Sequence, residues 1–417
     1  MRSPALAPVQ NGIEPGARRV RQSSIAPMTD SPGEVARFLT RNAVDALPGG
    51  ALESQLGLGR PLRVKLGVDP TTPDIHLGHT VVLRKLREFQ DLGHQVVLIV
   101  GDYTARVGDP SGRSSMRPFV DPAEIDHNAE TYEEQAFKVL DRSRTEVRRN
   151  GEWLDMPVED LFRLARVSTA AQILERDDFA KRYAAGEPIS ILELLYPLLQ
   201  GFDSVAVRAD VELGATDQKF NVLLAREIQK AYGVEPQSVL TMPILPGIDG
   251  AQKMSKSLGN YVGVDEPPEE VYGKLMRVPD EAMPLYYSLL LDAPPDPSLA
   301  ARDAKRAMAF ALCARLHGEE AATAAQERFD TLHVRRELPE EIEEFAFPDG
   351  GEPVHLPALL AEAFGVSRSE ARRLLSQAGV KLDGKALDES SLELPPDRLD
   401  GAVIQLGKRR FKRLRRR

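Results

Sequence analysis

The stretch RVKLGVDPTTPDIHLGHTVVLRKLREFQDLGHQVVLIV, residues 63–100, decides the fold of this chain. Its two ends, 62–67 and 95–100, predict strands, and the continuously apolar QVVLIV suits a parallel strand that is buried on both faces. Between them, apolar residues recur at helical spacing and a glycine follows: Val81, Val82, Leu86, Phe89, Leu92 and Gly93. A strand, a helix and a strand within about 40 residues form a βαβ unit.

The same alternation returns later in the chain. We expect a strand at 204–208, followed by a helix that Thr216 caps and that ends at Gly233. Strands that alternate with helices predict the α/β class, with a doubly wound parallel, Rossmann-like sheet. Ligands of such sheets bind in loops at the carboxyl ends of the strands.

The length of 417 residues exceeds what one hydrophobic core supports and allows two or three domains of roughly 150 residues each. No apolar run approaches the ~18 residues that a membrane-spanning helix needs, so we expect no membrane partner. Cys313 is the only cysteine, which excludes an intramolecular disulfide and a zinc site built from several thiolates. This usage fits a reducing compartment, and we expect the cytoplasm.

The net charge of −9 conceals a strong asymmetry along the chain. Residues 353–417 hold 14 basic and 8 acidic side chains, a net charge of +6, and the preceding 352 residues carry −15. The last ten residues, KRRFKRLRRR, include eight basic side chains. A basic arm on an acidic body indicates an anionic partner, although a charge run is more commonly a solvated face.

Composition also predicts the domain boundaries. Residues 1–30 are rich in Pro, Ser and Arg without periodicity, so we expect a disordered extension; a transit peptide and a true start at Met28 are the alternatives. The sheet domain is expected at 31–246 and a helical domain with the preceding loop at 247–345. Two prolines and two glycines in AFPDGGEP predict a linker, and the boundaries that follow are 346–353 for the linker and 354–417 for a basic module.

Asp69-Pro-Thr71 and His76-Leu-Gly-His79 lie between the first strand and its helix. A helix N-terminus presents free N–H groups and the positive end of a dipole, so anions bind there. The two histidines face one side, and Gly78 leaves room for a flat group against the backbone. A pair of surface or capping histidines is the structural alternative.

Lys253-Met-Ser-Lys256-Ser follows a Gly-Ile-Asp-Gly segment and therefore lies on a flexible loop. Two ammonium groups on a mobile loop suit a polyphosphate whose charge must be neutralised as a reaction proceeds. A solvated lysine loop is the alternative. It is disfavoured because this pentamer follows the histidine motif on a doubly wound sheet.

These motifs resemble the HIGH and KMSKS signatures of the class I aminoacyl-tRNA synthetases, and further segments resemble the bacterial-type tyrosyl members. Those segments are GDYTARVGDPSGR at 101–113, YPLLQGFD at 196–203 and GATDQ at 214–218. The resemblance runs from about Arg37 to the C-terminus. It implies that tyrosine and ATP react to tyrosyl-adenylate and pyrophosphate, and that tyrosine is then transferred to the terminal adenosine of tRNA(Tyr).

The resemblance also implies roles for individual residues. Asp203 would accept a hydrogen bond from the substrate phenol and reject phenylalanine, a discrimination for which this family is the standard example. The other implied tyrosine-binding residues are Thr104, Asp109, Asn150, Tyr196, Gln200 and Gln218. ATP would contact Asp69, Thr71, His76, Gly78, His79, Asp217, Lys253 and Lys256. The charge-stabilising catalytic group would comprise His76, His79, Lys253 and Lys256 with Arg113 and Arg117 as helpers. Mg²⁺ would accompany ATP, and neither zinc nor an organic cofactor is expected.

Two positions depart from the best-known members of the family. Those members have a tyrosine four residues before the Asp-Pro-Thr segment, where it helps to bind the substrate phenol, and this chain has Lys65 there. Leu66 stands where the same members have a cysteine near the ribose. Phenol recognition would then depend more heavily on Asp203.

The basic C-terminal segment resembles the RNA-binding module of the small-subunit ribosomal-protein-four type. SRSEARRLL at 367–375 predicts a capped amphipathic helix, and GVKLDGK at 379–385 predicts a strand and a turn. The expected tRNA-binding residues are Arg368, Arg372, Arg373, Lys408, Arg409 and Arg410. The family resemblance further implies a homodimer, formed through an insertion at about 120–165.

Three other functions compete with this interpretation. Tryptophanyl-tRNA synthetases share the fold and both signatures but usually lack the basic module, and the pattern from Tyr196 to Asp203 favours tyrosine. A non-catalytic RNA-binding protein on the same scaffold would not need intact signature motifs. Small-molecule nucleotidylyltransferases with a HIGH-like motif are much shorter.

Overall fold

The computed structural model describes residues 31–70, 74–110, 122–335, 342–348, 352–388, 392–407 and 410–417. The chain forms two compact units. The first extends to Asp265 and includes Ser288–Asp292, and the second contains Glu266–Tyr287 and Ala293–Arg417. The lysine loop therefore belongs to the sheet unit, whereas we expected it to group with the helical domain. The extension expected at 1–30 lies outside the described residues.

A six-stranded sheet forms the centre of the first unit, in the order β1-β6-β5-β2-β3-β4. All neighbouring strands are parallel except the edge strand β1, which is antiparallel to β6. The chain adds β3 and β4 on one side of β2 and then returns to add β5 and β6 on the other, which confirms the doubly wound fold. The strands are β1 (Asp45–Leu47), β2 (Arg63–Val68), β3 (Gln95–Val100), β4 (Thr145–Arg149), β5 (Val211–Ala215) and β6 (Ser238–Met242).

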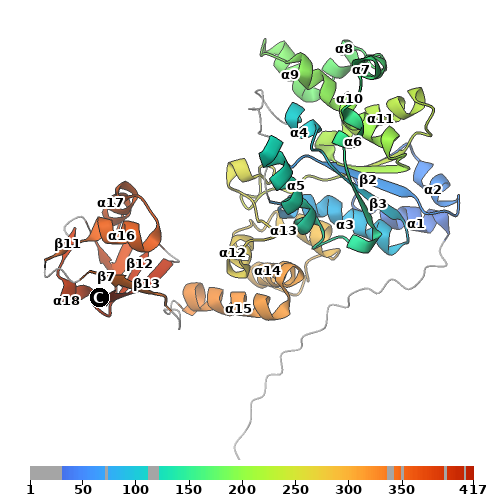
Figure 1. Cartoon of the computed structure of the whole chain (residues 1–417). Helices are drawn as coiled ribbons and strands as arrows, with labels where there is room; N and C mark the ends of the chain where they lie inside the picture. Colours follow the sequence, from blue (N-terminus) through green and yellow to red (C-terminus); the bar gives the residue numbers. More distant parts are fainter. Residues whose placement is uncertain are drawn as a thin grey trace, which may run out of the picture. The chain divides into compact units, whose positions relative to one another are not determined.

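Helices cover both faces of this sheet (Figure 1). The predicted helix is α3 (Leu77–Asp91), which ends before Gly93 at a positive φ of 86°, and it lies on one side. On the other side lie α10 (Ile191–Ala206) and α11 (Lys219–Ala231) (Figure 1). The remaining elements up to residue 265 are α1 (Pro32–Leu39), α2 (Ala51–Leu56), α4 (Thr104–Val107), α5 (Pro122–Ala136), η1 (Arg142–Arg144), α6 (Gly151–Leu154), α7 (Val158–Ala165), α8 (Ala170–Leu174), α9 (Asp177–Ala184), η2 (Thr216–Gln218) and η3 (Lys256–Leu258).

The strand expected at 204–208 is wrong. Those residues form the last turn of α10 and the bend after it, and the strand begins at Val211. A capping box between Ser190 and Glu193 starts α10, and the helix continues until Arg208 takes a positive φ of 51°. The helix is apolar on a broad face, so its end resembles a short strand in sequence.

Helices α10 and α11 pack closely because α10 carries a glycine at the contact. A Cβ atom on Gly201 would collide with the Ile228 side chain and would lie 3.2 Å from the Ala225 Cα atom. The backbone of α11 cannot yield without disturbing the sheet behind it. This contact holds the C-terminal half of α10 in place over the sheet.

We predict that Gly201→Ala destabilises the sheet unit by about 1–3 kcal/mol through overpacking. Chemical denaturation followed by circular dichroism measures the free energy of unfolding. Gly49→Ala is the matched control, because a Cβ atom there meets nothing within 4 Å. Equal stability of the two variants would contradict the proposed helix contact.

The second unit begins with helices, as the sequence predicts for this region. These are α12 (Pro268–Leu275), α13 (Met283–Tyr286), α14 (Ala301–His317) and α15 (Glu319–Phe329), with the π-helical turn η5 (Asp330–Arg335). Tyr272, Met308 and Cys313 are buried among them. A second π-helical turn, η4 (Tyr287–Leu291), belongs to the first unit except for its first residue. No helix in the described ranges is long and apolar enough to cross a membrane.

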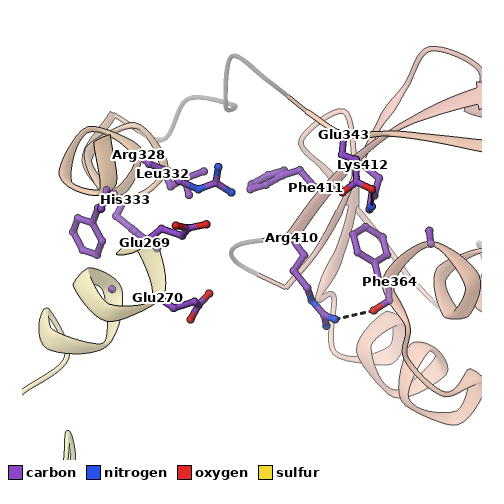
Figure 2. Close-up of a pocket in the computed structure, with 14 residues that line it drawn as sticks. Glu269, Glu270, Arg328, Leu332, His333, Glu343, Phe364, Arg410, Phe411 and Lys412 are labelled. Carbon is purple, nitrogen blue, oxygen red and sulfur yellow. Dashed lines mark hydrogen bonds and ion pairs between the residues drawn. The ribbon is translucent and has the colours of Figure 1, made fainter. Parts of the chain in front are cut away.

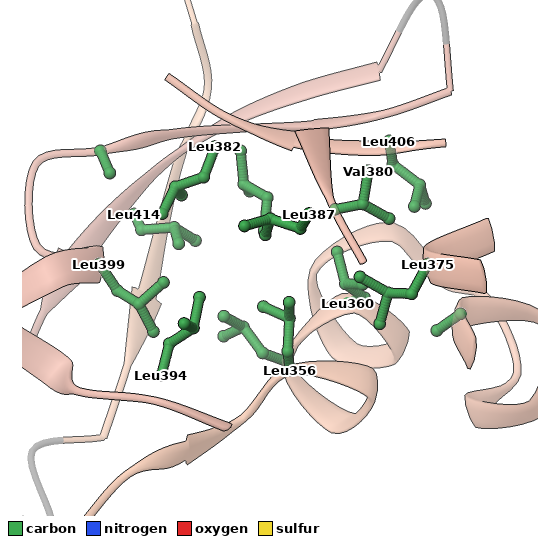
Figure 3. Close-up of a cluster of buried hydrophobic side chains, with 14 of the residues drawn as sticks. Leu356, Leu360, Leu375, Val380, Leu382, Leu387, Leu394, Leu399, Leu406 and Leu414 are labelled. Carbon is green, nitrogen blue, oxygen red and sulfur yellow. The ribbon is translucent and has the colours of Figure 1, made fainter. Parts of the chain in front are cut away.

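A small α+β module ends the chain. Its five-stranded sheet has the order β10-β9-β12-β13-β7, and its buried cluster joins residues of two helices, such as Leu360 and Leu375, to strand residues such as Leu406 and Leu414 (Figure 3). The elements are β7 (Glu344–Phe347), β8 (Val354–His355), α16 (Leu356–Phe364), α17 (Arg368–Ser376), β9 (Val380–Leu382), β10 (Lys385–Leu387), β11 (Glu393–Leu394), α18 (Pro396–Leu399), β12 (Val403–Leu406) and β13 (Arg410–Arg416).

The module begins earlier than the boundary expected at residue 354. Strand β7 pairs in parallel with β13, and Phe347 is fully buried in the core of the module. The proline and glycine signal at 346–353 therefore overlaps a strand, and its residues 349–351 lie outside the described ranges. The capped helix and the strand with its turn are confirmed, because Ser367 accepts a hydrogen bond from the Glu370 N–H and β9 pairs with β10.

Candidate active site

The candidate site lies where the strand order of the sheet reverses. Asp69 directly follows β2, and the segment from Thr216 to Gln218 directly follows β5. These neighbouring parallel strands lead into helices on opposite faces of the sheet, so their carboxyl ends open a crevice. The sequence motifs for nucleotide and amino acid therefore meet at one edge.

The two signature histidines are stacked at the start of α3. His76 is the N-cap, and its Nδ1 accepts a hydrogen bond from the Gly78 N–H at 3.1 Å. The ring centroids of His76 and His79 are 3.9 Å apart. Burial, with the charges of Lys253 and Lys256, lowers the pKa of His76 to about 2 and that of His79 to about 4. Both imidazoles are therefore neutral at physiological pH and can act as hydrogen-bond donors rather than as cations.

The lysine loop is tied to carboxylates at the mouth of the site. Lys253 donates to Asp217 Oδ2, and Lys256 donates to Asp74 Oδ2. Buried Asn260 holds the loop from below: its Nδ2 donates to Asp249 Oδ2 at 2.7 Å, and its Oδ1 accepts from the Ser255 N–H at 2.8 Å. The lysines therefore have local partners that an incoming polyphosphate must replace.

Asp69 joins two of the residues that are expected to bind tyrosine. Its Oδ1 accepts a hydrogen bond from the Thr104 hydroxyl at 2.7 Å, and its Oδ2 accepts one from the Tyr196 hydroxyl at 2.9 Å. A Cβ atom on Gly101 would collide with Asp69 and Thr104, so a glycine is required there. Asp69, which we expected among the ATP-binding residues, orients two of the residues expected to bind tyrosine.

A second network links three other residues that are expected to bind tyrosine: Asp109, Gln200 and Gln218. Gln218 Nε2 donates to Asp109 Oδ2 at 2.8 Å, and Asn221 Nδ2 donates to Gln200 Oε1 at 2.7 Å and to Gln218 Oε1 at 3.1 Å. Arg176 lies behind them, with its guanidinium 3.0 Å from Asn221 Oδ1 and 3.5 Å from Asp109 Oδ1. Side chains from three helical segments and the loop after α4 are thus joined in one hydrogen-bonded network.

Asp203 is buried on α10, with 2% of its surface exposed. Trp153 Nε1 donates to its Oδ1 at 2.8 Å, and Asn150 Nδ2 lies 3.5 Å from its Oδ2. Asn150 Nδ2 also donates to the Thr104 hydroxyl at 2.9 Å. Burial raises the pKa of Asp203 to about 7, against the lowering effects of Lys65 and of the two donors.

Lys65 lies inside the protein rather than in the pocket lining. Its ammonium group, which is completely buried, donates to Glu212 Oε1 at 2.8 Å, to Ser204 Oγ at 3.0 Å and to the Gln200 carbonyl at 3.1 Å. The position that the sequence marks as a departure from the family therefore holds a satisfied buried ion pair.

Sequence reasoning missed three contributors to the site: Trp153, Arg176 and Asn221. Trp153 is the only tryptophan of the chain and follows Asn150 by three residues, which is a signal that could have found it. Arg176 and Asn221 lie in no recognised motif. Thr71, Arg113 and Arg117, which we expected near ATP, lie outside the described residues.

The expected tRNA-binding residues divide between α17 and the last strand. Arg368, Arg372 and Arg373 are exposed on α17. Arg410 extends from β13 and donates to the Phe364 carbonyl at 3.3 Å (Figure 2). Lys408 and Arg409 lie outside the described ranges.

Comparison with known proteins matches this architecture to a family. The family model described as tRNA synthetases class I (W and Y) matches residues 58–334. A tyrosine–tRNA ligase of Thermotoga maritima is 50% identical over 92% of this chain and 98% of the relative, and one of Moorella thermoacetica is 49% identical over 91% and 95%.

The chain belongs to the bacterial-type class I tyrosyl-tRNA synthetases. Solved tyrosyl-tRNA synthetases share the fold of this synthetase. The Archaeoglobus fulgidus protein complexed with L-tyrosine is 25% identical with a TM-score of 0.60, over 71% of this chain and 99% of its own. A truncated mitochondrial protein of Aspergillus nidulans is 22% identical with the same TM-score, over 73% and 94%.

The synthetase should show one aspartate with an unusually high titration midpoint. Asp203 is protonated below pH about 7 and ionised above it, because burial disfavours the charged form. Carbon-13 NMR of the labelled aspartate carboxyl groups measures this midpoint, and Asp203→Asn assigns the resonance. Titration of every aspartate below pH about 5 would contradict the burial of an ionisable group at this position.

Proposed function

We infer that this synthetase activates tyrosine with ATP and transfers it to tRNA(Tyr). The observation that carries this inference is Asp203, a buried carboxylate whose Oδ1 atom accepts a hydrogen bond from Trp153. A substrate with a phenol donates to the second oxygen. A substrate without a hydroxyl leaves a buried carboxylate poorly satisfied, which costs free energy.

The amino-acid substrate is oriented by groups at both ends. Asp203 accepts the phenol hydrogen bond, supported by Asn150. At the other end, Tyr196, Gln200 and Asp109 bind the ammonium group, Thr104 lies near it, and Gln218 lies beside the carboxylate. Asp69 acts on this set by fixing Tyr196 and Thr104, so we place it with the amino acid rather than with ATP.

The first step joins the tyrosine carboxylate to the α-phosphorus of ATP and releases pyrophosphate. Catalysis comes from positioning and from charge stabilisation, with no protein nucleophile. His76, Gly78 and His79 contact the phosphates and adenosine; the histidines act as neutral donors.

Lys253 and Lys256 leave Asp217 and Asp74 for the phosphates as the negative charge develops. Their departure frees Asp217 to bind the ribose. Thr71, Arg113 and Arg117 keep their expected contacts with ATP and pyrophosphate as part of this proposal. Mg²⁺ accompanies ATP, because protein sites for it commonly consist of a few carboxylates plus substrate phosphates.

The second step requires the tRNA. Its terminal hydroxyl attacks the adenylate carbonyl and releases AMP. The exposed arginines Arg368, Arg372 and Arg373, with Lys408, Arg409 and Arg410, bind the tRNA backbone through the basic module, and the helices of the second unit bind the anticodon region. We also propose a homodimer formed through about 120–165 and a cytoplasmic location.

Amino-acid-dependent exchange of labelled pyrophosphate into ATP tests the proposed function. Tyrosine should support rapid exchange, and phenylalanine and tryptophan should support little, because neither offers a hydroxyl to Asp203. Exchange with tryptophan instead of tyrosine would overturn the substrate assignment. Absence of exchange with any amino acid would favour a binding protein on the same scaffold.

Charge reversal on α17 tests the role of the basic module. Arg368→Glu with Arg372→Glu should lower the rate of tRNA charging at subsaturating tRNA by about tenfold or more and spare pyrophosphate exchange, because phosphate contacts dominate affinity for nucleic acid. Arg87→Glu, on exposed α3 surface beside Asp91, is the matched control and should change neither rate. A parallel loss of exchange in the α17 variant would contradict the modular division.

A further inference from the structure

The middle of β2 contains a charged residue between the buried apolar residues Val64 and Leu66. Lys65 is completely buried, and lysine is almost never fully buried unless it is paired. Its partner is Glu212, which is 1% exposed. The two residues are direct neighbours in the register of β2 and β5, the two strands between which the sheet reverses its order. The ion pair therefore joins the two strands whose carboxyl ends border the site.

All donors and acceptors of this pair are satisfied without a ligand. Lys65 has three partners for its three protons: Glu212, Ser204 and the Gln200 carbonyl. The Glu212 Oε2 atom accepts from Ser204 at 3.0 Å and from Gln237. Lys65 thus cannot replace the family's tyrosine as a phenol partner unless it leaves one of these groups.

The Lys65–Glu212 pair contacts α10 on both sides of Asp203, the residue proposed to bind the phenol hydroxyl. Lys65 bonds to α10 at Gln200 and Ser204, and Asp203 is on the turn between them. The charged groups that act on Asp203 are Lys65 from β2 and Glu212 from β5. From α6 and the residue that precedes it come the uncharged donors Trp153 and Asn150. Arg148 of β4 lies over the Trp153 ring, with its charge paired to Glu152.

We propose that the Lys65–Glu212 ion pair helps to determine substrate specificity. Lys65 keeps Asp203 in the carboxylate form that accepts a hydrogen bond from the phenol, and Glu212 holds the Lys65 ammonium group away from the bound substrate. Both residues are positioning residues, since neither touches the substrate. This inference rests on the proposed tyrosine specificity. It explains how this chain, which has Lys65 in place of the family's tyrosine, recognises the substrate phenol through Asp203 alone.

The electrostatic signs support this role. Burial raises the pKa of Asp203, the Lys65 charge lowers it, and the Glu212 charge raises it by less. Removing the charges of Lys65 and Glu212 together therefore raises the pKa of Asp203 further. Removing Glu212 alone leaves an unpaired buried ammonium, which is expected to turn to Asp203 as the remaining carboxylate and to compete with the phenol.

The pH dependence of kcat/KM for tyrosine in pyrophosphate exchange tests the proposal, because this parameter reports the ionisation of the free enzyme. In the wild-type protein, kcat/KM should be half-maximal at pH about 7 and fall at lower pH. Lys65→Met with Glu212→Gln should lower it by about tenfold at pH 6 and by less than about twofold at pH 8.5, with an unchanged KM for ATP. Glu212→Gln alone should raise the KM for tyrosine at pH 8.5 as well.

A second buried pair supplies the matched control. Arg182 of α9 and Glu193 of α10 are 3% and 10% exposed, and Glu193 lies in the first turn of α10, ten residues before Asp203. Arg182→Met with Glu193→Gln should keep the wild-type pH dependence even if it lowers stability. A double Lys65/Glu212 variant that also keeps the wild-type pH dependence would overturn the proposal. Absence of tyrosine-dependent exchange in the wild-type protein would instead overturn the proposed function itself.

Discussion

The burial of Asp203 is the constraint on which the arrangement of the pocket depends. A carboxylate that is removed from water needs donors and positive charge in place of its hydration shell. Three side chains supply them: Trp153 of α6, Asn150 directly before α6, and Lys65 of β2. These three groups therefore offset the free-energy cost of burying the Asp203 carboxylate.

The reversal of strand order explains why these groups can converge. At this point β2 and β5 are neighbours in space although far apart in sequence, and the Lys65–Glu212 pair joins them directly. Beyond their carboxyl ends lie Asp69 and Asp217, for which we propose roles toward the amino acid and the nucleotide respectively. The stacked histidines and the lysine loop then approach from the mouth. In the proposed function, one edge of the sheet thus binds both substrates of the first reaction step.

Sequence reasoning predicted the periodic elements and the motifs, but not the long-range contacts. The continuous apolar run at 95–100 and the helix before it are found as expected. The end of α10 was mistaken for a strand because a broadly apolar helix end has no short-range signature that distinguishes it. The contacts of Trp153 and Arg176 depend on tertiary packing, which spacing alone does not specify. Strand β7 is stabilised by a partner more than 60 residues away in sequence, so its turn-like surroundings concealed it.

A crystal structure of the synthetase with bound tyrosine tests the central claim most directly. We expect the phenol oxygen to lie within hydrogen-bond distance of Asp203 Oδ2. Trp153 should still donate to Asp203 Oδ1, and Lys65 should remain paired with Glu212. A phenol oxygen that contacts the Lys65 ammonium group, released from Glu212, would contradict the proposed role of Asp203. In that case the lysine would bind the substrate directly, and Asp203 would not be the group that distinguishes tyrosine from phenylalanine.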